Sequence, residues 1–446
     1  MAFSSAISTS TKAAAKFLTG SKLTAFSACR IRNLTLRSYQ SQNLLKEVWH
    51  LTPAQESHVD NVPVIQYGIP VPQGIVAQSP AEVYDAIHNI NHLCVLKAQL
   101  LHPRLGNAPF ESGLRGGYHT VQTPDQGRDV ASRMLGHKII EHEQGNVGTA
   151  VNQVYVSKHT AFRDKWYLAM TVDREHYSPV IIISKNGGED VQAIAERHPE
   201  SLYSFNFSLS QGITQDLVAQ ICATVGTSSQ ESANLQKILV NLYTIFREKD
   251  ATLLEVNPLA ASDDGTLTCL DSRFSFDDDA TRRQPDIFSL RDKDQEVKDE
   301  VEAEKYGLVY IRLDGNIGNI VNGAGLAMAT NDAIGLHGGA SANFLDAGGQ
   351  ATKETMQQAL GIVLRDERVK SVLISIYGGI TRCDMIAESI IGAAQEMDLS
   401  VPIVIRLQGT NSVEGLKLLA DANLGLHVES DFGLAAQRAV ELANSS

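Results

Sequence analysis

The residues with the clearest capacity for chemistry lie in the segment 253–271, which reads LLEVNPLAASDDGTLTCLD. Two short apolar runs flank an Asp-Asp-Gly turn that ends at Gly265, a pattern that predicts a β-hairpin. Such a hairpin would place Glu255, Asn257 and Asp271 near one face. Their carboxylate and amide oxygens are ligands that Mg²⁺ accepts, usually together with waters and substrate phosphates. The same spacing also fits a hairpin with ordinary exposed acids, because oxygen-bearing residues are common in loop-rich sheets.

A lysine lies within a second apolar run. Residues 94–100, CVLKAQL, have the composition of a strand, and Lys97 is at its centre. A charged side chain within a strand is unfavourable unless it points at an anion or at solvent. The following segment, 101–117, is rich in glycine and is predicted to be a mobile loop. Lys97 is therefore a candidate for binding an anion.

The pattern of the chain changes at residue 308. Short, nearly continuous apolar strands then alternate with helical segments, which predicts a parallel α/β sheet covered on both faces. Ligands of such sheets bind beyond the carboxyl ends of the strands. Glycines there let backbone N–H groups gather around an anion, and several such junctions together favour a carboxylate or phosphate site. The glycine-containing turns are 315–325, 344–349, 377–384 and 406–411.

Length and charge restrict the possible functions. A chain of 446 residues is long enough for two or three domains. The formal net charge of −13 argues against nucleic acid or an anionic membrane as the main partner, since either would require a basic surface. No apolar run approaches the roughly 20 residues needed to span a bilayer. The five cysteines contain no CxxC pair, so neither a disulfide framework nor a cysteine metal site is predicted.

The N-terminal segment has a distinct composition. Residues 1–37 contain six Lys or Arg but no Asp or Glu, and they are rich in Ser, Thr and Ala. This composition is typical of a mitochondrial or plastid transit peptide, although a disordered basic tail is an alternative. We expect the leader to span residues 1–37. An irregular, proline-interrupted segment at 48–65 suggests an insertion near the start of the folded chain.

The remaining chain divides into two predicted domains. Alternating apolar segments between residues 138 and 184 predict strands of an α+β sheet. The highly charged segment 274–307 predicts a linker with some helix, and we place the domain boundary within it. The predicted fold is therefore α/β, with an α+β domain at 38–285 followed by a parallel α/β domain at 286–446.

Four segments together are specific enough to identify a family. The sequences GNIGNIVNGAGLAM, SANFLDAGGQATKE, YGGITRCD and LLEVNPLA closely resemble those of the β subunit of succinyl-CoA synthetase, also called succinate–CoA ligase. The resemblance covers the chain from about Tyr39 to its C-terminus. It implies that 38–285 is an ATP-grasp domain that binds nucleotide. It also implies that 286–446 is a flavodoxin-like domain that contacts an α subunit and helps to hold substrate.

The resemblance further implies a reaction. The family converts succinyl-CoA, a nucleoside diphosphate and phosphate reversibly to succinate, CoA and a nucleoside triphosphate, in the tricarboxylic acid cycle of the mitochondrial matrix. The expected cofactors are Mg²⁺ and ATP/ADP or GTP/GDP. The α subunit carries CoA and the phosphorylated histidine, so this chain would be half of the enzyme. Nucleic acid and membranes are not expected as partners.

Roles for individual residues follow from matching the family's motifs. The match implies that Asn257 and Asp271 are the Mg²⁺ ligands and that Glu255 is the catalytic carboxylate near the phosphohistidine. The residues implied in nucleotide binding are Lys97, Gly106 and Thr160, and those implied in substrate binding are Asn322, Gly379, Ile380 and Thr381. His337, in the sequence LHGG, matches a helix-end turn of the β subunit and not the phosphohistidine.

Departures from the family pattern cluster around the nucleotide. The family's Gly-Gly-Arg-Gly-Lys loop is replaced by PRLGN at 103–107, in which proline removes a backbone donor and leucine removes a guanidinium. Ser157 and Lys165 lie where acids are usual. Two hypotheses stay open: an active succinate–CoA ligase β subunit, or a regulatory or structural β-like subunit that pairs with α but binds nucleotide weakly. ATP-citrate lyase and malate–CoA ligase share the architecture, but their size or partners make them less favoured.

Overall fold

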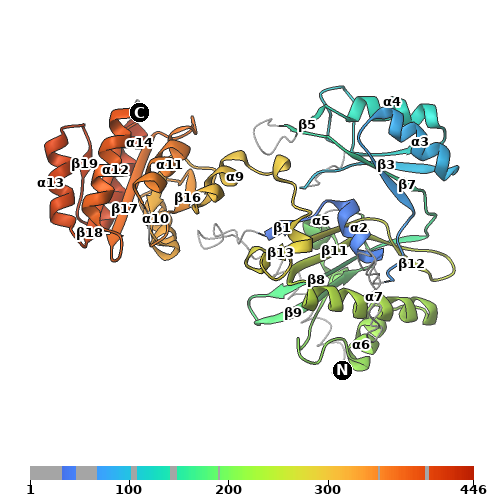
Figure 1. Cartoon of the computed structure of the whole chain (residues 1–446). Coiled ribbons are helices and arrows are strands. Elements are labelled where there is room, and N and C mark those ends of the chain that lie inside the picture. The colour runs from blue at the N-terminus through green and yellow to red at the C-terminus, as the bar shows by residue number, and fades with distance from the viewer. Residues whose placement is uncertain are drawn as a thin grey trace, which may run out of the picture. The chain divides into compact units, whose positions relative to one another are not determined.

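A computed structural model describes residues 33–46, 68–101, 108–140, 148–188, 191–349, 352–396 and 401–445. These residues form two compact units, and the chain passes from one to the other between Gln295 and Glu296 (Figure 1). This division lies in the charged segment that was expected to contain the domain boundary, but on the C-terminal side of residue 285. Most of the predicted leader, the predicted insertion at 48–65 and the loop at 103–107 lie outside the described residues.

The larger sheet of the first unit is antiparallel. Its seven described strands follow the order β1-β13-β11-β8-β9-β10, with β12 paired to β11. Their bounds are β1 Asn33–Thr35, β8 Asp164–Asp173, β9 Ser178–Ser184, β10 Tyr203–Asn206, β11 Ala251–Ala261, β12 Leu267–Cys269 and β13 Ser272–Asp277. Because β11 pairs with β8, β12 and β13, the segment 253–271 lies in the middle of this sheet.

Helices cover both faces of the larger sheet. α6 (Gln215–Val225) and α7 (Ser229–Glu248) place apolar side chains at helical spacing against one face, where they form the main core with Trp166, Leu254 and Phe274. α5 (Val191–Arg197) packs with Ile182 on the other face. The unit also contains α2 (Ser38–Lys46) and, near its end, α8 (Pro285–Phe288).

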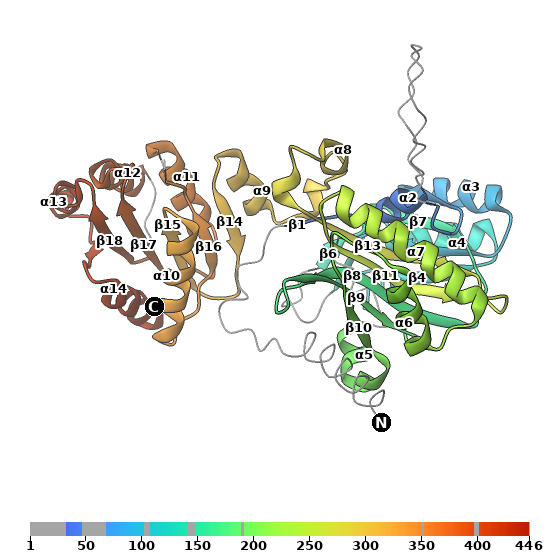
Figure 2. The same cartoon turned by 90° about the horizontal axis from the view of Figure 1, so that it is seen from below.

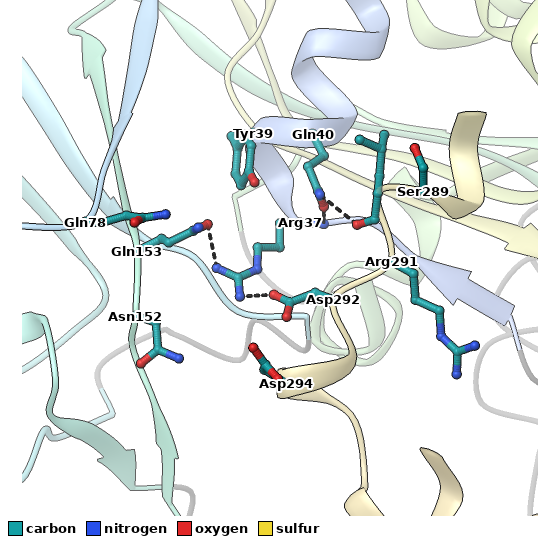
Figure 3. Close-up of a pocket in the computed structure, with 11 residues that line it drawn as sticks. Arg37, Tyr39, Gln40, Gln78, Asn152, Gln153, Ser289, Arg291, Asp292 and Asp294 are labelled. Atoms are coloured by element: carbon teal, nitrogen blue, oxygen red, sulfur yellow. Dashed lines mark hydrogen bonds and ion pairs between the residues drawn. The ribbon is translucent and has the colours of Figure 1, made fainter. Parts of the chain in front are cut away.

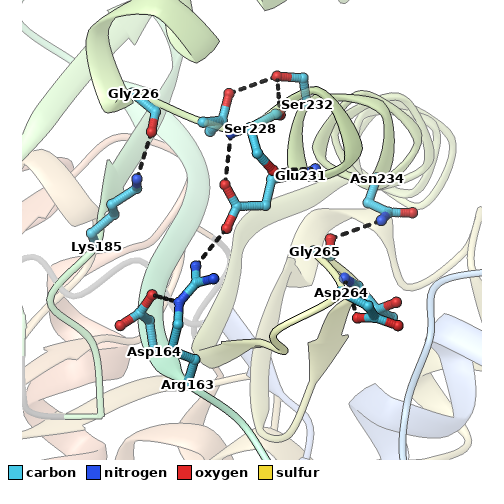
Figure 4. Close-up of polar contacts among 12 residues, drawn as sticks. Arg163, Asp164, Lys185, Gly226, Ser228, Glu231, Ser232, Asn234, Asp264 and Gly265 are labelled. Atoms are coloured by element: carbon cyan, nitrogen blue, oxygen red, sulfur yellow. Dashed lines mark hydrogen bonds and ion pairs between the residues drawn. The ribbon is translucent and has the colours of Figure 1, made fainter.

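A buried carboxylate ties the start of α7 to the sheet (Figure 4). The Ser228 side chain accepts the backbone N–H of Glu231, and the Glu231 carboxylate accepts the backbone N–H of Ser228 at 2.8 Å. The Arg163 guanidinium donates to the other oxygen of Glu231 at 2.9 Å. Burial acts to raise the pKa of Glu231, but the hydrogen bonds from Ser228 and Arg163 outweigh burial and leave the pKa below its ordinary value.

A smaller, four-stranded antiparallel sheet completes the described part of the first unit. Its order is β2-β7-β3-β4, with β2 at Gly74–Ala77, β3 at Cys94–Ala98, β4 at Tyr118–Val121 and β7 at Val154–Lys158. α3 (Pro80–Ile90) and α4 (Pro124–Met134) pack on it, and β5 (Lys138–Ile140) pairs with β6 (Gly148–Ala150). Both helices begin with proline after a side-chain cap, Ser79 for α3 and Thr123 for α4.

The first described residues belong to the fold of this unit. Strand β1 pairs with β13, and the side chains of Leu34 and Leu36 are buried in the main core. Arg37 is only 4% exposed. The expected end of the leader at residue 37 therefore does not coincide with the start of the folded unit, which includes residues 33–37.

The second unit is a parallel α/β sheet with one antiparallel edge strand. Its described strands follow the order β14-β16-β15-β17-β18-β19, and β14 pairs antiparallel to β16. In Figure 2, α11, α12 and α13 lie on one side of the strands and α10 and α14 on the other. The strands are β14 Val309–Arg312, β15 Ile317–Val321, β16 Asn343–Asp346, β17 Ser371–Gly378, β18 Ile403–Gly409 and β19 His427–Val428. The helices are α9 Lys298–Lys305, α10 Ala324–Leu336, α11 Lys353–Leu364, α12 Cys383–Glu396, α13 Ser412–Ala422 and α14 Phe432–Ser445.

The predicted α/β fold class is confirmed by these two sheets. Continuous apolar strands such as β17 are buried because helices cover both faces of the second sheet, as the pattern from residue 308 predicted. The antiparallel direction of β14 is a difference, since its residues were predicted to belong to a parallel strand. Across the described ranges, no helix combines the length and apolar composition that crossing a membrane requires.

Candidate functional site

The predicted hairpin at 253–271 is confirmed. β11 and β12 are antiparallel, with Leu259 opposite Cys269. The turn between them is closed by hydrogen bonds from the N–H of Ser262 to the carbonyl of Thr266 and from the N–H of Gly265 to the carbonyl of Ser262, each 3.0 Å. Gly265 has φ +81°, a conformation that glycine adopts without the strain that a side chain would introduce.

The structure places the backbones of Asn257 and Asp271 side by side. The N–H of Asn257 donates to the carbonyl of Asp271 at 3.0 Å, and the N–H of Leu270 donates to the carbonyl of Pro258 at 3.1 Å. The pairing of β11 with β8 shifts register between Val256 and Leu259, where the Asn257-Pro258 bond is cis. Asp271 lies between β12 and β13, directly before the first residue of β13.

The side chain of Asp271 lies in a compact polar cluster. Its Oδ1 forms an ion pair with the ammonium of Lys97, accepts the Ser38 hydroxyl and accepts the backbone N–H of Ser272 at 2.7 Å. Its Oδ2 accepts the hydroxyl of Tyr118 at 2.8 Å. Lys97 also donates to Ser38 Oγ at 2.6 Å. We call Asp271, Lys97, Tyr118 and Ser38 the Asp271 cluster.

The charged pair of the Asp271 cluster is largely shielded from solvent, whereas Tyr118 as a whole is 45% exposed. The side chains of Lys97 and Asp271 are 6% and 14% exposed. Burial lowers the pKa of Lys97, and the nearby Asp271 carboxylate opposes this effect. Burial and the same carboxylate raise the pKa of Tyr118 well above its ordinary value, so the hydroxyl keeps its proton and acts as a donor.

Strand pairing explains how residues distant in sequence meet in this cluster. Tyr118 on β4 is directly opposite Lys97 on β3. Both belong to the smaller sheet, whereas Asp271 lies between two strands of the larger sheet and Ser38 begins α2. The cluster therefore joins the two sheets of the first unit. Tyr118 and Ser38 were not predicted as site residues; pairing the segments CVLKA and YHTV as antiparallel strands would have been the signal for Tyr118.

The other residues predicted around the hairpin have different surroundings. Asn257 Oδ1 accepts the backbone N–H of Gly188 at 2.7 Å, so its amide also holds the turn after β9. Glu255 is half-buried and lies opposite Arg273 on β13. Because side chains alternate along a strand, Glu255 points away from the core that buries Leu254.

The predicted nucleotide residues are only partly covered by the structure. Lys97 is buried as described, and Thr160 is half-buried just after β7. Gly106, in the altered loop, lies outside the described residues. Ser157 is half-buried within β7, and Lys165 is exposed on β8 with its ammonium 5.1 Å from the centre of the Phe162 ring.

In the second unit, the predicted substrate residues gather at the carboxyl ends of β15 and β17. Asn322 holds these ends together, because its side chain donates to the carbonyl of Tyr377 at 2.8 Å and accepts the N–H of Tyr377 at 2.9 Å. Thr381 is buried and donates to the carbonyl of Gly349 at 2.7 Å. Ile380 is 80% exposed, and the carbonyl of the adjacent Gly379 accepts the Thr410 hydroxyl.

The structure supports the helix-end interpretation of LHGG. Leu336 ends α10, and His337 follows as its C-cap residue. Gly338 has φ +79°, and the N–H of Gly339 donates to the carbonyl of Ile334 at 3.0 Å. This is the usual way in which glycine terminates a helix.

A polar pocket in the first unit lies beside the start of α2 (Figure 3). Its volume is about 430 Å³. The Arg37 guanidinium crosses it, donating to Gln153 Oε1 at 2.8 Å and forming an ion pair with Asp292. Gln40 donates to the carbonyl of Leu290 at 2.9 Å. These contacts tie the first described residues to the end of the unit.

The donor set at the hairpin fits Mg²⁺ in its chemistry. A carboxylate and an amide oxygen from adjacent backbone positions, Asp271 and Asn257, are oxygen ligands of the type that Mg²⁺ takes together with phosphate oxygens. In the structure both Asp271 oxygens and the Asn257 oxygen accept hydrogen bonds from the protein. Within the described residues, no group of three or more His, Cys, Asp or Glu is arranged to hold a metal ion, so waters and phosphates would have to complete the shell.

Comparisons with known proteins agree with the two units. The family model described as an ATP-grasp domain matches residues 60–261, and the one described as CoA-ligase matches residues 320–440. The chain is 39% identical over 415 residues to the hydrogenosomal β subunit of succinate–CoA ligase (ADP-forming) from Neocallimastix frontalis, covering 93% of this chain and 91% of that protein. It is 38% identical over 418 residues to the mitochondrial β subunit of the same name from Saccharomyces cerevisiae, covering 93% of each.

A solved structure shares the fold at low sequence identity. ATP citrate lyase from Methanothrix soehngenii, in complex with citrate and coenzyme A, aligns with a TM-score of 0.62 at 16% identity. The alignment covers 93% of this chain and 100% of that chain. At this identity the likeness concerns the fold alone.

Proposed function

Because this chain belongs to the family of succinate–CoA ligase (ADP-forming) β subunits, we propose that it pairs with an α subunit to interconvert succinyl-CoA and succinate. Membership makes the chain a subunit of an acid–thiol ligase with an ATP-grasp domain. In the proposed reaction, succinyl-CoA, ADP or GDP, and phosphate give succinate, CoA and the nucleoside triphosphate, through a phosphohistidine on the α subunit. The mitochondrial names of several relatives support a mitochondrial location, and we propose the matrix.

The observation that carries this proposal is the buried pairing of Lys97 with Asp271. Phosphoryl transfer needs positioning and neutralisation of negative charge more than covalent chemistry from the protein. Lys97 would place a shielded positive charge against the nucleotide phosphates, where low solvent exposure strengthens the interaction. The half-buried Thr160, which follows β7 of the smaller sheet, would contact the nucleotide.

Asn257 and Asp271 would hold the Mg²⁺ ion. The chemistry that Mg²⁺ would supply there is neutralisation of the negative charge on the phosphates during transfer. Glu255, on the face of β11 opposite the main core, would accept a ring N–H of the α-subunit histidine and so orient its other nitrogen toward the phosphate. In the direction that consumes the nucleoside triphosphate, a nitrogen–phosphorus bond forms as the bond between the γ-phosphorus and the oxygen of the leaving nucleoside diphosphate breaks; in the other direction the same step runs in reverse.

In the second unit, the loops that follow β15 and β17 would receive the succinate carboxylates. Asn322 fixes these loops relative to each other through the backbone of Tyr377. The backbone at Gly379 and Ile380 and the hydroxyl of Thr381 supply hydrogen-bonding groups at the same edge of the sheet, where ligands of parallel sheets bind.

A second candidate function is a β-like subunit that pairs with α but binds nucleotide weakly. Ser157 and the exposed Lys165, which stand in place of the usual acids, favour it. In that case the second unit would still contact the α subunit, whereas the first would have lost its ligand.

Labelling of the α-subunit histidine separates the two functions. The full chain is co-expressed with its cognate α subunit, and the purified complex is incubated with Mg²⁺ and γ-labelled ATP or GTP. The active β subunit predicts an acid-labile, base-stable label on the α subunit and a thermal shift with nucleotide. A stable complex with neither label nor shift for either nucleotide would refute that function and favour the second one. The α subunit alone is the control.

A further inference from the structure

We propose that Lys97 and Tyr118 form a latch over the Asp271 carboxylate, so that a divalent metal ion reaches Asp271 only when nucleotide phosphates draw Lys97 away. This inference rests on the proposed function, because it concerns the metal and nucleotide of that site. Tyr118 is then a positioning residue, since it acts through Asp271. The latch makes metal binding depend on nucleotide binding.

The hydrogen bonds of Asp271 provide the first argument. A carboxylate has about four lone-pair directions, two on each oxygen, and Asp271 accepts four protein donors. Three of these donors, from Lys97, Ser38 and Ser272, are on Oδ1, and the Tyr118 hydroxyl is on Oδ2. An ion that binds Oδ1 must therefore displace a donor, and an ion that binds Oδ2 must share that oxygen with the Tyr118 hydroxyl.

The position of the Lys97 ammonium provides the second argument. It is in direct contact with Oδ1, so a cation about 2.1 Å from either carboxylate oxygen would lie close to a like charge. Solvent screens this repulsion weakly, because both side chains are nearly buried. The ammonium must therefore turn away before the metal ion can bind.

Lys97 can turn away only toward another anion. Its side chain leaves the middle of the smaller sheet, between β4 and β7, and a buried ammonium without a partner is strongly unfavourable. Nucleotide phosphates would supply that partner, and the four-carbon stem of lysine allows the ammonium to move without a change in the strand. The metal alone supplies no such partner.

Tyr118 determines how firmly the latch holds. Its hydroxyl keeps Oδ2 occupied, and its ring lies 5.4 Å from the Lys97 ammonium, within the range of a cation–π contact. The tyrosine therefore stabilises both partners of the ion pair. Tyr118→Phe removes the hydroxyl but keeps the ring, which leaves one oxygen of Asp271 open.

The test uses Mn²⁺ as a paramagnetic substitute for Mg²⁺ and the purified complex with the α subunit. Electron paramagnetic resonance measures free Mn²⁺ with and without ADP, for wild type, Lys97→Met, Tyr118→Phe and the control Lys237→Met, which changes an exposed lysine on α7. Without nucleotide, we expect weak Mn²⁺ binding by wild type and Lys237→Met, binding by Lys97→Met at least tenfold tighter than by wild type, and a several-fold gain in affinity for Tyr118→Phe. With ADP, wild type should show a bound signal distinct from that of Mn-ADP in buffer.

Two outcomes would overturn the latch. The first is Mn²⁺ binding by wild type without nucleotide that is as tight as in Lys97→Met. The second is no gain in Mn²⁺ affinity for Tyr118→Phe. Phenylalanine keeps the shape of the tyrosine ring, so misfolding would be a poor explanation of that result. The histidine-labelling experiment tests the proposed function separately. Gains in both variants together with an unlabelled α subunit would support the latch but refute the active ligase.

Discussion

Removing the charge of Asp271 should destabilise the first unit by about 3–5 kcal/mol, the usual cost of breaking a buried ion pair from one side. The Asp271→Asn change leaves the Lys97 ammonium, only 6% exposed, without an opposite charge. It also weakens the hydrogen bonds from Tyr118 and Ser272, since donors bind a carboxylate more strongly than an amide.

The reciprocal change should cost less. Lys97→Met removes the ammonium but leaves Asp271 with the hydroxyls of Ser38 and Tyr118, the N–H of Ser272 and a 14% exposed side chain. We expect a loss of about 1–3 kcal/mol. The double variant contains no unpaired charge, so its loss should be smaller than the sum of the two single losses by about 2 kcal/mol or more.

Urea unfolding followed by tryptophan fluorescence suits this measurement. Trp166 is buried in the main core of the first unit, and residues 296–446 contain no tryptophan, so the change in fluorescence on unfolding reports on the first unit. A matched control cycle uses Arg128→Met and Asp125→Asn, an exposed ion pair of 2.7 Å at the start of α4. That pair should couple by no more than about 1 kcal/mol. If the losses of unfolding free energy in the Lys97 and Asp271 variants sum to that of their double variant as closely as they do for the control pair, the buried coupling is refuted.

Three further predictions concern other sites. The pKa of Glu231 in the folded chain lies below its ordinary value of 4.5, so its stabilising contribution is present above about pH 4.5 and is lost as pH falls through the lowered pKa. In urea unfolding, the difference in unfolding free energy between wild type and Glu231→Gln should therefore shrink on acidification. A difference that stays constant with pH would exclude the ion pair with Arg163 as its cause. Asn322→Ala removes two hydrogen bonds to the Tyr377 backbone. In steady-state kinetics it should raise the KM for succinate several-fold and leave the KM for nucleotide nearly unchanged. Equal rises in the two KM values would contradict a local role for Asn322. Gly187→Ala would bring a Cβ within 2.3 Å of the β8 backbone, and a lower urea midpoint, corresponding to about 1–3 kcal/mol, is expected; an unchanged midpoint would show that the turn relaxes freely.

The parts of the fold that could be predicted from sequence are those with a local cause. The hairpin at 253–271 has a turn residue between two short apolar runs, and the strands of the second unit are apolar throughout because both of their faces are covered. The edge strand β14 was predicted as a strand but not as an antiparallel one, since its apolar pattern is the same in either direction.

The composition of the Asp271 cluster depends on tertiary contacts. Lys97 was recognisable because a charge in a strand needs a partner, and Asp271 was recognisable by its motif. Ser38 and Tyr118 are ordinary residues in their own segments, and they meet Asp271 from 233 and 153 positions away along the chain. Only the pairing of β3 with β4 and the position of α2 bring them together.

If the N-terminal segment is removed as a leader, as we expect, the contacts of residues 33–38 bear on where it is cut. Cleavage after residue 37 would remove the strand that pairs with β13 and the guanidinium that holds Asp292. It would also turn Ser38 into the first residue, with a free α-ammonium only a few bonds from the hydroxyl that contacts Asp271 and Lys97. A processed chain that keeps all of β1 would have to begin at or before residue 33, so the length of such a leader and the charge balance of the Asp271 cluster would depend on the same short segment.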